Sequence, residues 1–125
     1  YFRRTFWPRI INDTTANAFH NYFVLNDIKI DYLHIDADHT YEGCKLDFDL
    51  YSTIMNENGI ISIHDTDSRY WDTFETYEDE PHDTCYGPSD FIKEIPNEWQ
   101  KFDLFDYRDK SEKVSSSGLT ILRRI

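Results

Sequence analysis

The chain has 125 residues, of which 17% are aromatic, and a formal net charge of −11 at pH 7. The length and aromatic content predict one globular domain over residues 1–125 and argue against a disordered chain. The acidic charge argues against a nucleic-acid partner, because phosphate binding needs clustered Lys and Arg. No apolar run approaches the roughly 20 residues that cross a bilayer, so we expect no membrane partner. With only Cys44 and Cys85, we expect a reducing, cytoplasmic compartment.

The first predicted element is a short strand over Arg9 to Asn12, which contains the apolar pair Ile10-Ile11. A polar turn, Asp13-Thr14-Thr15, comes next. One of these three residues is expected to begin a helix over Ala16 to Phe23, because their side-chain oxygens can accept hydrogen bonds from free backbone N–H groups.

The segment from Asp31 to Asp67 predicts a strand, a helix and a second strand. Tyr32 to Ile35 is mainly apolar without clean alternation, which is typical of a strand covered on both faces. Ile60 to Ile63 is a second buried strand of the same kind. Between them, a helix is expected over Tyr41 to Asn56. The residues of its apolar face are Cys44, Phe48, Tyr51 and Met55.

This helix is expected to end at Asn58-Gly59, since Gly adopts the left-handed conformation favoured after a helix. Two strands joined by one helix form a unit with a right-handed crossover, so the strands run parallel. The acidic turns that follow them therefore emerge at the same edge of the sheet, where open α/β sheets bind ligands.

Ionisable residues are concentrated in these two turns. Asp36, Asp38 and His39 follow the first strand, and His64 and Asp65 follow the second. Carboxylates at neighbouring strand ends can converge on a divalent cation, and a His ligand favours Mn²⁺, Fe²⁺ or Zn²⁺ over Mg²⁺. The structural alternative is that Asp38, or Thr40 beside it, caps the following helix.

The last third of the chain predicts two further elements. Residues 68–87 predict a short helix and a loop, and Ser89-Asp90 is expected to cap a helix that Pro96 ends. The segments Trp99 to Tyr107 and Leu119 to Leu122 predict an antiparallel hairpin. His82 and Cys85 form an H-x-x-C pair, which alone is a weak zinc signal.

The string from Leu33 to Gly43, LHIDADHTYEG, followed by Asn58 to Thr66, NGIISIHDT, resembles class I S-adenosylmethionine-dependent methyltransferases. It is similar to the branch with an IDGDHSYE turn and a later GGIIxxHD strand, which includes sugar and antibiotic O-methyltransferases. The resemblance implies an α/β fold with a Rossmann-like, mostly parallel sheet, helices on both faces and a C-terminal antiparallel hairpin. It also implies an O-methyl transfer from S-adenosylmethionine to a small-molecule hydroxyl.

The resemblance also implies roles for individual residues. Asp36, His64 and Asp65 become ligands of a divalent cation such as Mg²⁺ or Mn²⁺, and Asp38 or His39 becomes the base. Asp13 and Thr14 match the turn that contacts the adenine of the cofactor. Asp36 is also assigned to cofactor binding. The cation would lower the pKa of the acceptor hydroxyl.

Two alternatives to an active methyltransferase come from different features of the sequence. The four glycines are Gly43, Gly59, Gly87 and Gly118, and none lies in the glycine-rich context of the cofactor loop, so an incomplete methyltransferase fold is expected. A non-catalytic fragment that forms homo-oligomers through an exposed sheet edge is the first alternative. The second comes from the turn at residues 36–40, DADHT, which fits the D-x-D-x-T pattern of haloacid-dehalogenase-like phosphatases and would use Asp36 and Asp38.

Overall fold

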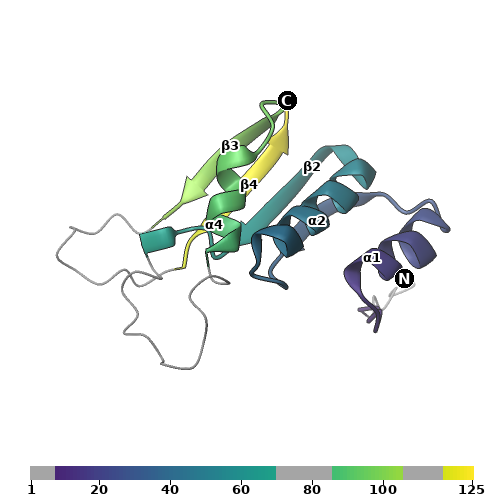
Figure 1. Ribbon diagram of the computed structural model, residues 1–125. Helices are drawn as coiled ribbons and strands as arrows, with labels where there is room; N and C mark the ends of the chain where they lie inside the picture. The colour runs from purple at the N-terminus through teal and green to yellow at the C-terminus, as the bar shows by residue number, and fades with distance from the viewer. Residues whose placement is uncertain (1–7, 70–85, 106–116) are drawn as a thin grey trace, which may run out of the picture.

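The computed structural model describes residues 8–69, 86–105 and 117–125. These residues form one mixed four-stranded sheet with helices packed against it (Figure 1). The elements in chain order are α1 (Thr15–Ala18), η1 (Phe19–Val24), β1 (Ile30–Ile35), α2 (Tyr41–Tyr51), η2 (Ser52–Ile54), β2 (Met55–His64), α4 (Gly87–Phe91), η4 (Ile92–Glu94), β3 (Trp99–Leu104) and β4 (Leu119–Arg124).

The strands lie in the order β1-β2-β4-β3. Strands β1 and β2 are parallel and are joined through α2, so the predicted strand–helix–strand unit is confirmed. Strand β4 lies between β2 and β3 and is antiparallel to both, which confirms the C-terminal hairpin. Because only one of these three pairs is parallel, the sheet in the described part of the chain is mixed instead of mostly parallel.

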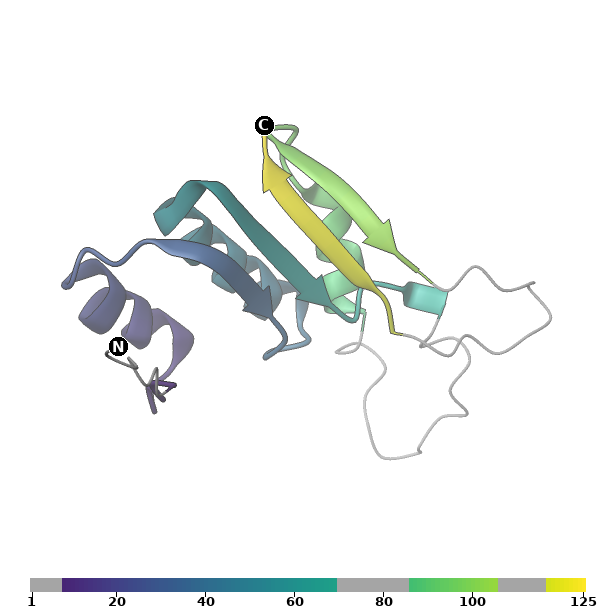
Figure 2. The ribbon, with the colours of Figure 1, turned by 180° about the vertical axis from the view of Figure 1, so that it is seen from behind.

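The two faces of the sheet differ in their covering. Helices α2 and α4 pack on one face, where Ile61, Ile63 and Leu122 are 0% exposed. No helix of the described segments lies on the other face (Figure 2). Tyr32 of β1 is 61% exposed there, so the expectations of a β1 strand covered on both faces and of helices on both faces are not met by the described residues.

Helix α2 is shorter than predicted and β2 is longer. Thr40 caps α2, with its Oγ1 accepting a hydrogen bond from Gly43 N at 3.0 Å. The helix ends at Tyr51, and Met55 already pairs with Ile30 of β1. The prediction that Gly59 ends the helix in a left-handed conformation is therefore wrong.

Gly59 instead lies inside β2, beside an irregularity in the pairing with β1. The residues between Met55 and Ile60 outnumber those between Ile30 and Tyr32, so the chain bulges there. A Cβ at Gly59 would lie 2.6 Å from Met55 Cε and 3.2 Å from Ile30 O. Glycine thus fits a position where Met55 and the backbone oxygens approach closely, and any larger residue would require these neighbours to shift.

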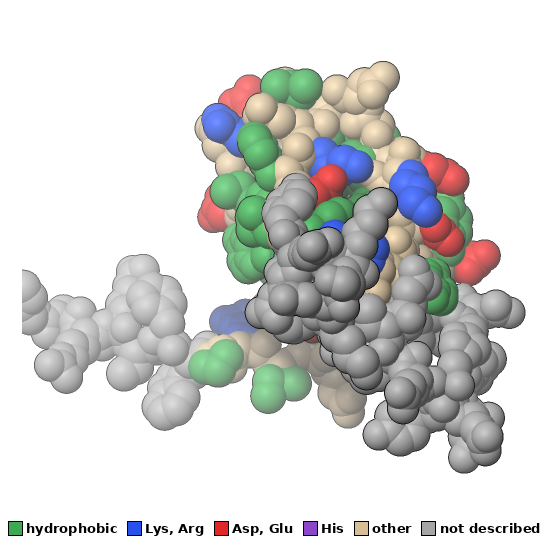
Figure 3. Space-filling view, turned by 90° about the vertical axis from the view of Figure 1, so that its left-hand side faces the viewer, with side chains coloured by type: hydrophobic (Ala, Val, Ile, Leu, Met, Phe, Trp, Pro, Cys, Tyr) green, Lys and Arg blue, Asp and Glu red, His purple; other side chains and the backbone are tan. Residues whose placement is uncertain are grey.

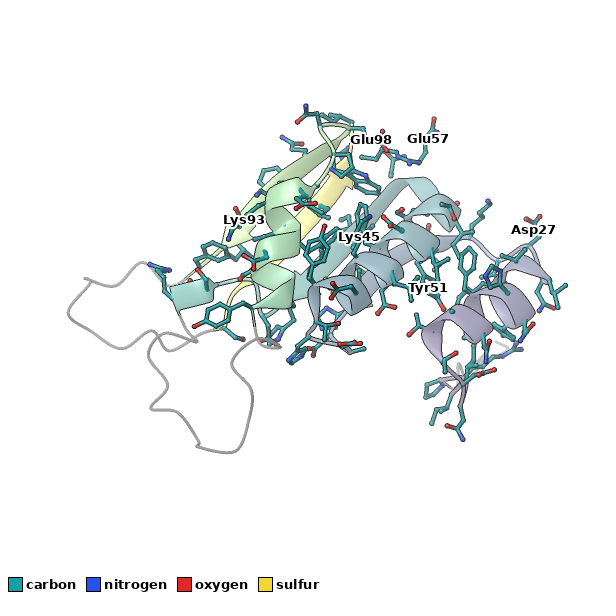
Figure 4. All side chains as sticks on the ribbon, viewed as in Figure 1. Asp27, Lys45, Tyr51, Glu57, Lys93 and Glu98 are labelled. Carbon is teal, nitrogen blue, oxygen red and sulfur yellow. The ribbon has the colours of Figure 1, made fainter. Side chains whose placement is uncertain are left out.

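The N-terminal segment confirms the helix but not the strand. Thr14 caps α1, and the helical segment runs from Thr15 through η1. Residues 9–12 form no strand, because no described strand lies beside them to take their backbone hydrogen bonds. Tyr51 of α2 points toward α1 (Figure 4), where its hydroxyl donates to Thr15 O at 3.0 Å and its ring packs edge-on against Phe19.

Helix α4 begins earlier than the sequence predicted. Its first residue is Gly87, and Ser89 lies inside the helix, where its hydroxyl donates to Tyr86 O at 2.8 Å. The expected capping role of Ser89-Asp90 is therefore wrong. The His82 and Cys85 pair, and most of the segment predicted as a short helix and loop, lie outside the described residues.

Three further properties of the described residues bear on the surface and the core. At the end shown in Figure 3, the visible Lys and Arg side chains are interspersed with Asp and Glu. No helix among the described segments has the length and apolar character needed to span a bilayer. Cys44 is 1% exposed, and burial raises the pKa of its thiol to about 12, so this cysteine stays a protonated core residue.

Candidate metal centre

The carboxyl ends of β1 and β2 bring three predicted ligands together. Asp36 directly follows β1, His64 is the last residue of β2, and Asp65 comes next. The parallel register pairs Ile35 with Ile63, so the two strands end side by side. One potential ligand atom from each of the three residues lies within 4.8 Å of the others. The predicted convergence of the two turns is therefore present.

His39 joins this cluster from the turn after β1. Its Nε2 lies 3.0 Å from Asp65 Oδ2 and 3.6 Å from Asp36 Oδ1. His64 Nδ1 lies 3.0 Å from Asp65 Oδ1 and 3.5 Å from Asp36 Oδ1. Two carboxylates and two imidazoles thus face one another, and Asp65 is the most buried of the four, with 7% of its side chain exposed.

His64 Nδ1 is a buried polar atom without a hydrogen-bond partner among the described residues. Its 3.0 Å contact with Asp65 Oδ1 does not have the geometry of a hydrogen bond. A buried nitrogen left in this state is unfavourable unless another group engages it. An imidazole nitrogen beside two carboxylate oxygens is a donor set that fits a divalent cation.

The backbone at Asp65 is held in an unusual conformation. Its φ of 59° lies in the left-handed region, which residues other than glycine seldom adopt. Such a conformation costs about 1–3 kcal/mol and persists where the surrounding structure enforces it, often at functional sites. Here it turns the chain directly after β2 and places the Asp65 carboxylate against His39 and His64.

Asp38 is directed to the start of α2. Its Oδ1 accepts a hydrogen bond from Thr40 N at 2.9 Å, and this bond is the main cause that holds the pKa of the Asp38 carboxyl below its ordinary value. The side chain also packs against Gly43, where a Cβ would overlap Asp38 Cγ. A lowered pKa makes a carboxylate a weaker base, so of the two predicted bases His39 is the better placed.

Asp13 and Thr14, the predicted cofactor residues, lie at the start of α1. Asp13 Oδ1 accepts from Thr14 N at 2.8 Å and from Asn17 Nδ2 at 2.9 Å. Thr14 Oγ1 accepts from Asn17 N at 3.3 Å. These contacts give both residues a capping role, and their contact with a cofactor stays a prediction.

A cleft of about 340 Å³ lies beside the free edge of β1. Five consecutive residues from the end of β1 form one wall, and α1 and α2 form the other. The strand order leaves this edge of β1 without a described partner. The lining residues are Thr15, Leu33, His34, Ile35, Asp36, Ala37, Asp47 and Tyr51.

A polar chain next to the candidate metal centre was not predicted from the sequence. Tyr32 and His34 of β1 meet Ser62 of β2 on the sheet face opposite α2. The signal was the spacing of Tyr32, His34 and Asp36, which places every second residue of a strand on one face. It was overlooked because Leu33 and Ile35 between them make the segment look uniformly apolar.

Residues 2–66 match the family model of a methyltransferase domain, which covers just over half of the chain. The structure is similar to a putative caffeoyl-CoA O-methyltransferase from Staphylococcus aureus, with 17% sequence identity and a TM-score of 0.67 over 94% of this chain and 51% of that chain. It is also similar to an O-methyltransferase from Bacillus cereus in complex with SAH, with 12% identity and a TM-score of 0.61 over 90% of this chain and 48% of that chain. The chain thus spans about half the length of these structures. A search of curated proteins gave no match.

Proposed function

Because the chain belongs to the methyltransferase-domain family, we propose that it supplies the cation- and acceptor-binding part of an S-adenosylmethionine-dependent O-methyltransferase. The observation that carries this proposal is the cluster of Asp36, His64 and Asp65, in which His64 Nδ1 is buried without a hydrogen-bond partner among the described residues. The acceptor would be a small molecule with a hydroxyl group. The family match offers no support for the phosphatase alternative.

The three residues would hold a divalent cation such as Mg²⁺ or Mn²⁺. A bound cation supplies Lewis acidity, which makes an acceptor hydroxyl easier to deprotonate. His39 lies at the edge of the cluster, with 37% of its side chain exposed. An imidazole can accept a proton near neutral pH, which suits His39 to the role of base. Asp65 would keep the His39 ring oriented through the 3.0 Å contact with Nε2.

The cofactor would be S-adenosylmethionine, with Asp13, Thr14 and Asp36 as its predicted contacts. Asp36 lines the cleft beside β1, and Thr15, adjacent to Thr14, lies on its other side. The cleft therefore connects the two turns that the family resemblance assigns to the cofactor. A reducing, cytoplasmic location is part of the proposal, and the buried free thiol of Cys44 is consistent with it.

Calorimetric titration of the chain tests the proposal. We expect heat of binding with Mn²⁺ or Mg²⁺, and then binding of S-adenosylmethionine to the cation-loaded chain. Absence of binding for both cations would contradict the proposed function. Cation binding without cofactor binding would restrict the chain to the acceptor and cation half of the reaction.

A second proposal concerns the free edge of β1. An edge strand presents unpaired N–H and C=O groups that can pair with another extended segment, and a second copy of the chain offers the same edge. We therefore propose self-association through β1, opposed by the charge of −11 on each copy. Light scattering should show dimers that increase with salt concentration, and a monomer at every salt concentration would contradict this.

A further inference from the structure

The polar chain beside the metal centre consists of Tyr32, Ser62 and His34. In the parallel register, His34 lies directly opposite Ser62. Ser62 Oγ is 2.7 Å from Tyr32 Oη and 2.8 Å from His34 Nδ1, and Ser62 is 2% exposed. The buried hydroxyl therefore links a phenol on one side to an imidazole on the other.

The chemistry of these groups favours one direction for their hydrogen atoms. A phenol is more acidic than an aliphatic hydroxyl, so Tyr32 donates to Ser62 Oγ. Ser62 then donates to His34 Nδ1, since its other acceptor, Leu33 O, is 3.5 Å away, at the limit of a hydrogen bond. A neutral imidazole that accepts at Nδ1 carries its hydrogen on Nε2.

His34 Nε2 faces the carboxylate of Asp36. Nε2 lies 3.8 Å from Oδ2, whereas the other oxygen, Oδ1, faces the cluster at 3.5 Å from His64 Nδ1 and 3.6 Å from His39 Nε2. The two oxygens of Asp36 are thus divided between His34 and the proposed cation site. A hydrogen on Nε2 attracts Oδ2, whereas a lone pair at that position would repel it. This contact therefore favours the Nε2–H tautomer of His34, which is also the tautomer that the hydrogen bond from Ser62 favours.

We propose that His34 is a positioning residue for the proposed cation site: Ser62 and Tyr32 fix its Nε2–H tautomer, and that N–H attracts Asp36 Oδ2 across 3.8 Å, which favours the orientation in which Oδ1 faces His39 and His64. The inference rests on the proposed function. Groups that hydrogen-bond to metal ligands typically contribute 10- to 100-fold in metal affinity, and we expect the longer contact of His34 to contribute at the lower end of this range. The sheet face opposite α2 therefore takes part in the site through a contact that the sequence motifs of the family do not include.

The first experiment measures the tautomer without any cation. In nitrogen-15 NMR spectra of the chain, the ring of His34 should show the Nε2–H tautomer at a pH where it is neutral. Ser62→Ala should weaken this preference, because Nδ1 loses its donor. A predominant Nδ1–H tautomer in the unmodified chain would overturn the proposal.

The second experiment measures Mn²⁺ affinity from the electron paramagnetic resonance signal of the free ion. His34→Leu should weaken binding about 10-fold, and His34→Gln, which keeps an N–H donor, should recover part of the loss. His20→Leu, an exposed position in η1, is the matched control and should leave affinity unchanged. Thermal unfolding of each variant identifies those that fail to fold, and in that case Ser62→Ala provides the test, with a smaller expected loss.

The outcomes separate this proposal from the proposed function. An unmodified chain that binds no Mn²⁺ contradicts both. Normal Mn²⁺ binding that folded His34→Leu leaves unchanged contradicts the role of His34 alone.

Discussion

The two faces of the sheet are built from the same strands, yet one is buried under helices and the other is partly exposed. On the face covered by α2 and α4, Ile61, Ile63 and Leu122 are completely buried and form the core. On the other face, Tyr32 and Phe102 are 61% and 47% exposed. The polar chain lies on this open face and ends beside the candidate metal centre. The covered face therefore holds the core, and the open face carries the residues to which we assign a positioning role.

The largest expected effect is a loss of folding stability, and it is measured by comparing neighbouring residues on opposite faces of the sheet. Ile61→Ala should destabilise the chain by about 2–5 kcal/mol, because it leaves a cavity in the core. Ile60→Ala removes the same atoms from a side chain that is 40% exposed, so we expect a loss below about 1 kcal/mol. Urea unfolding of the two variants measures both values, and equal losses would show that the open face is covered in solution.

The next effect concerns the contact between α4 and the turn after β1. A Cβ at Gly87 would overlap the backbone of His39, Thr40 and Tyr41. Gly87→Ala should cost about 1–3 kcal/mol through overpacking, and it should also weaken Mn²⁺ binding because His39 must move. Asp90→Ala, at an exposed position of the same helix, is the control. Unchanged stability in Gly87→Ala would contradict the close packing of α4 on this turn.

A smaller effect is expected where α2 meets α1. Tyr51→Phe removes the hydrogen bond to Thr15 O but keeps the ring that packs against Phe19. We expect a loss of about 0.5–1.5 kcal/mol, the usual net value of one hydrogen bond. Thermal unfolding measures it, and Mn²⁺ affinity should not change. A change in cation affinity would mean that α1 takes part in the site.

The smallest effect depends on pH and concerns Asp38. The hydrogen bond from Thr40 N lowers the pKa of this carboxyl in the folded chain. Its ionised form therefore stabilises the fold above the ordinary pKa, and this contribution is lost as the pH falls through the lowered pKa. Asp38→Asn should be slightly less stable at neutral pH and equal to the unmodified chain in acid. A stability difference that is constant with pH would contradict this.

Much of the fold follows from local patterns. The periodic apolar face of α2 and the polar Thr40 before it predicted the helix and its first residue, and the apolar runs predicted β1 and β2. The end of α2 was misplaced because Met55 continues the helical periodicity, whereas its pairing with Ile30 in the sheet decides its conformation. Such a long-range pairing leaves no local signal in the sequence.

The part of the candidate site that lies at strand ends could be predicted from the sequence. Asp36, His64 and Asp65 follow two parallel strands, and parallel strands end at one edge of a sheet. The sequence alone could not separate the roles of Asp38 and His39, because the two residues are adjacent in the turn after the same strand. The structure separates them: Asp38 binds Thr40 N, and His39 contacts Asp65. His34 was not predicted as a site residue, because the role that we propose for it depends on its contact with Ser62, 28 residues away.

We propose that Asp36, His64 and Asp65 bind a divalent cation, and Mn²⁺ titration of Asp65→Asn tests this claim. Asn tolerates the left-handed conformation at this position, so the substitution removes the charge while the backbone is kept. Asp49→Asn, an exposed residue of α2, makes the same change of charge outside the site. We predict one Mn²⁺ site in the unmodified chain and in Asp49→Asn, with binding weakened by at least about tenfold in Asp65→Asn. Equal Mn²⁺ affinity in all three proteins would contradict the claim.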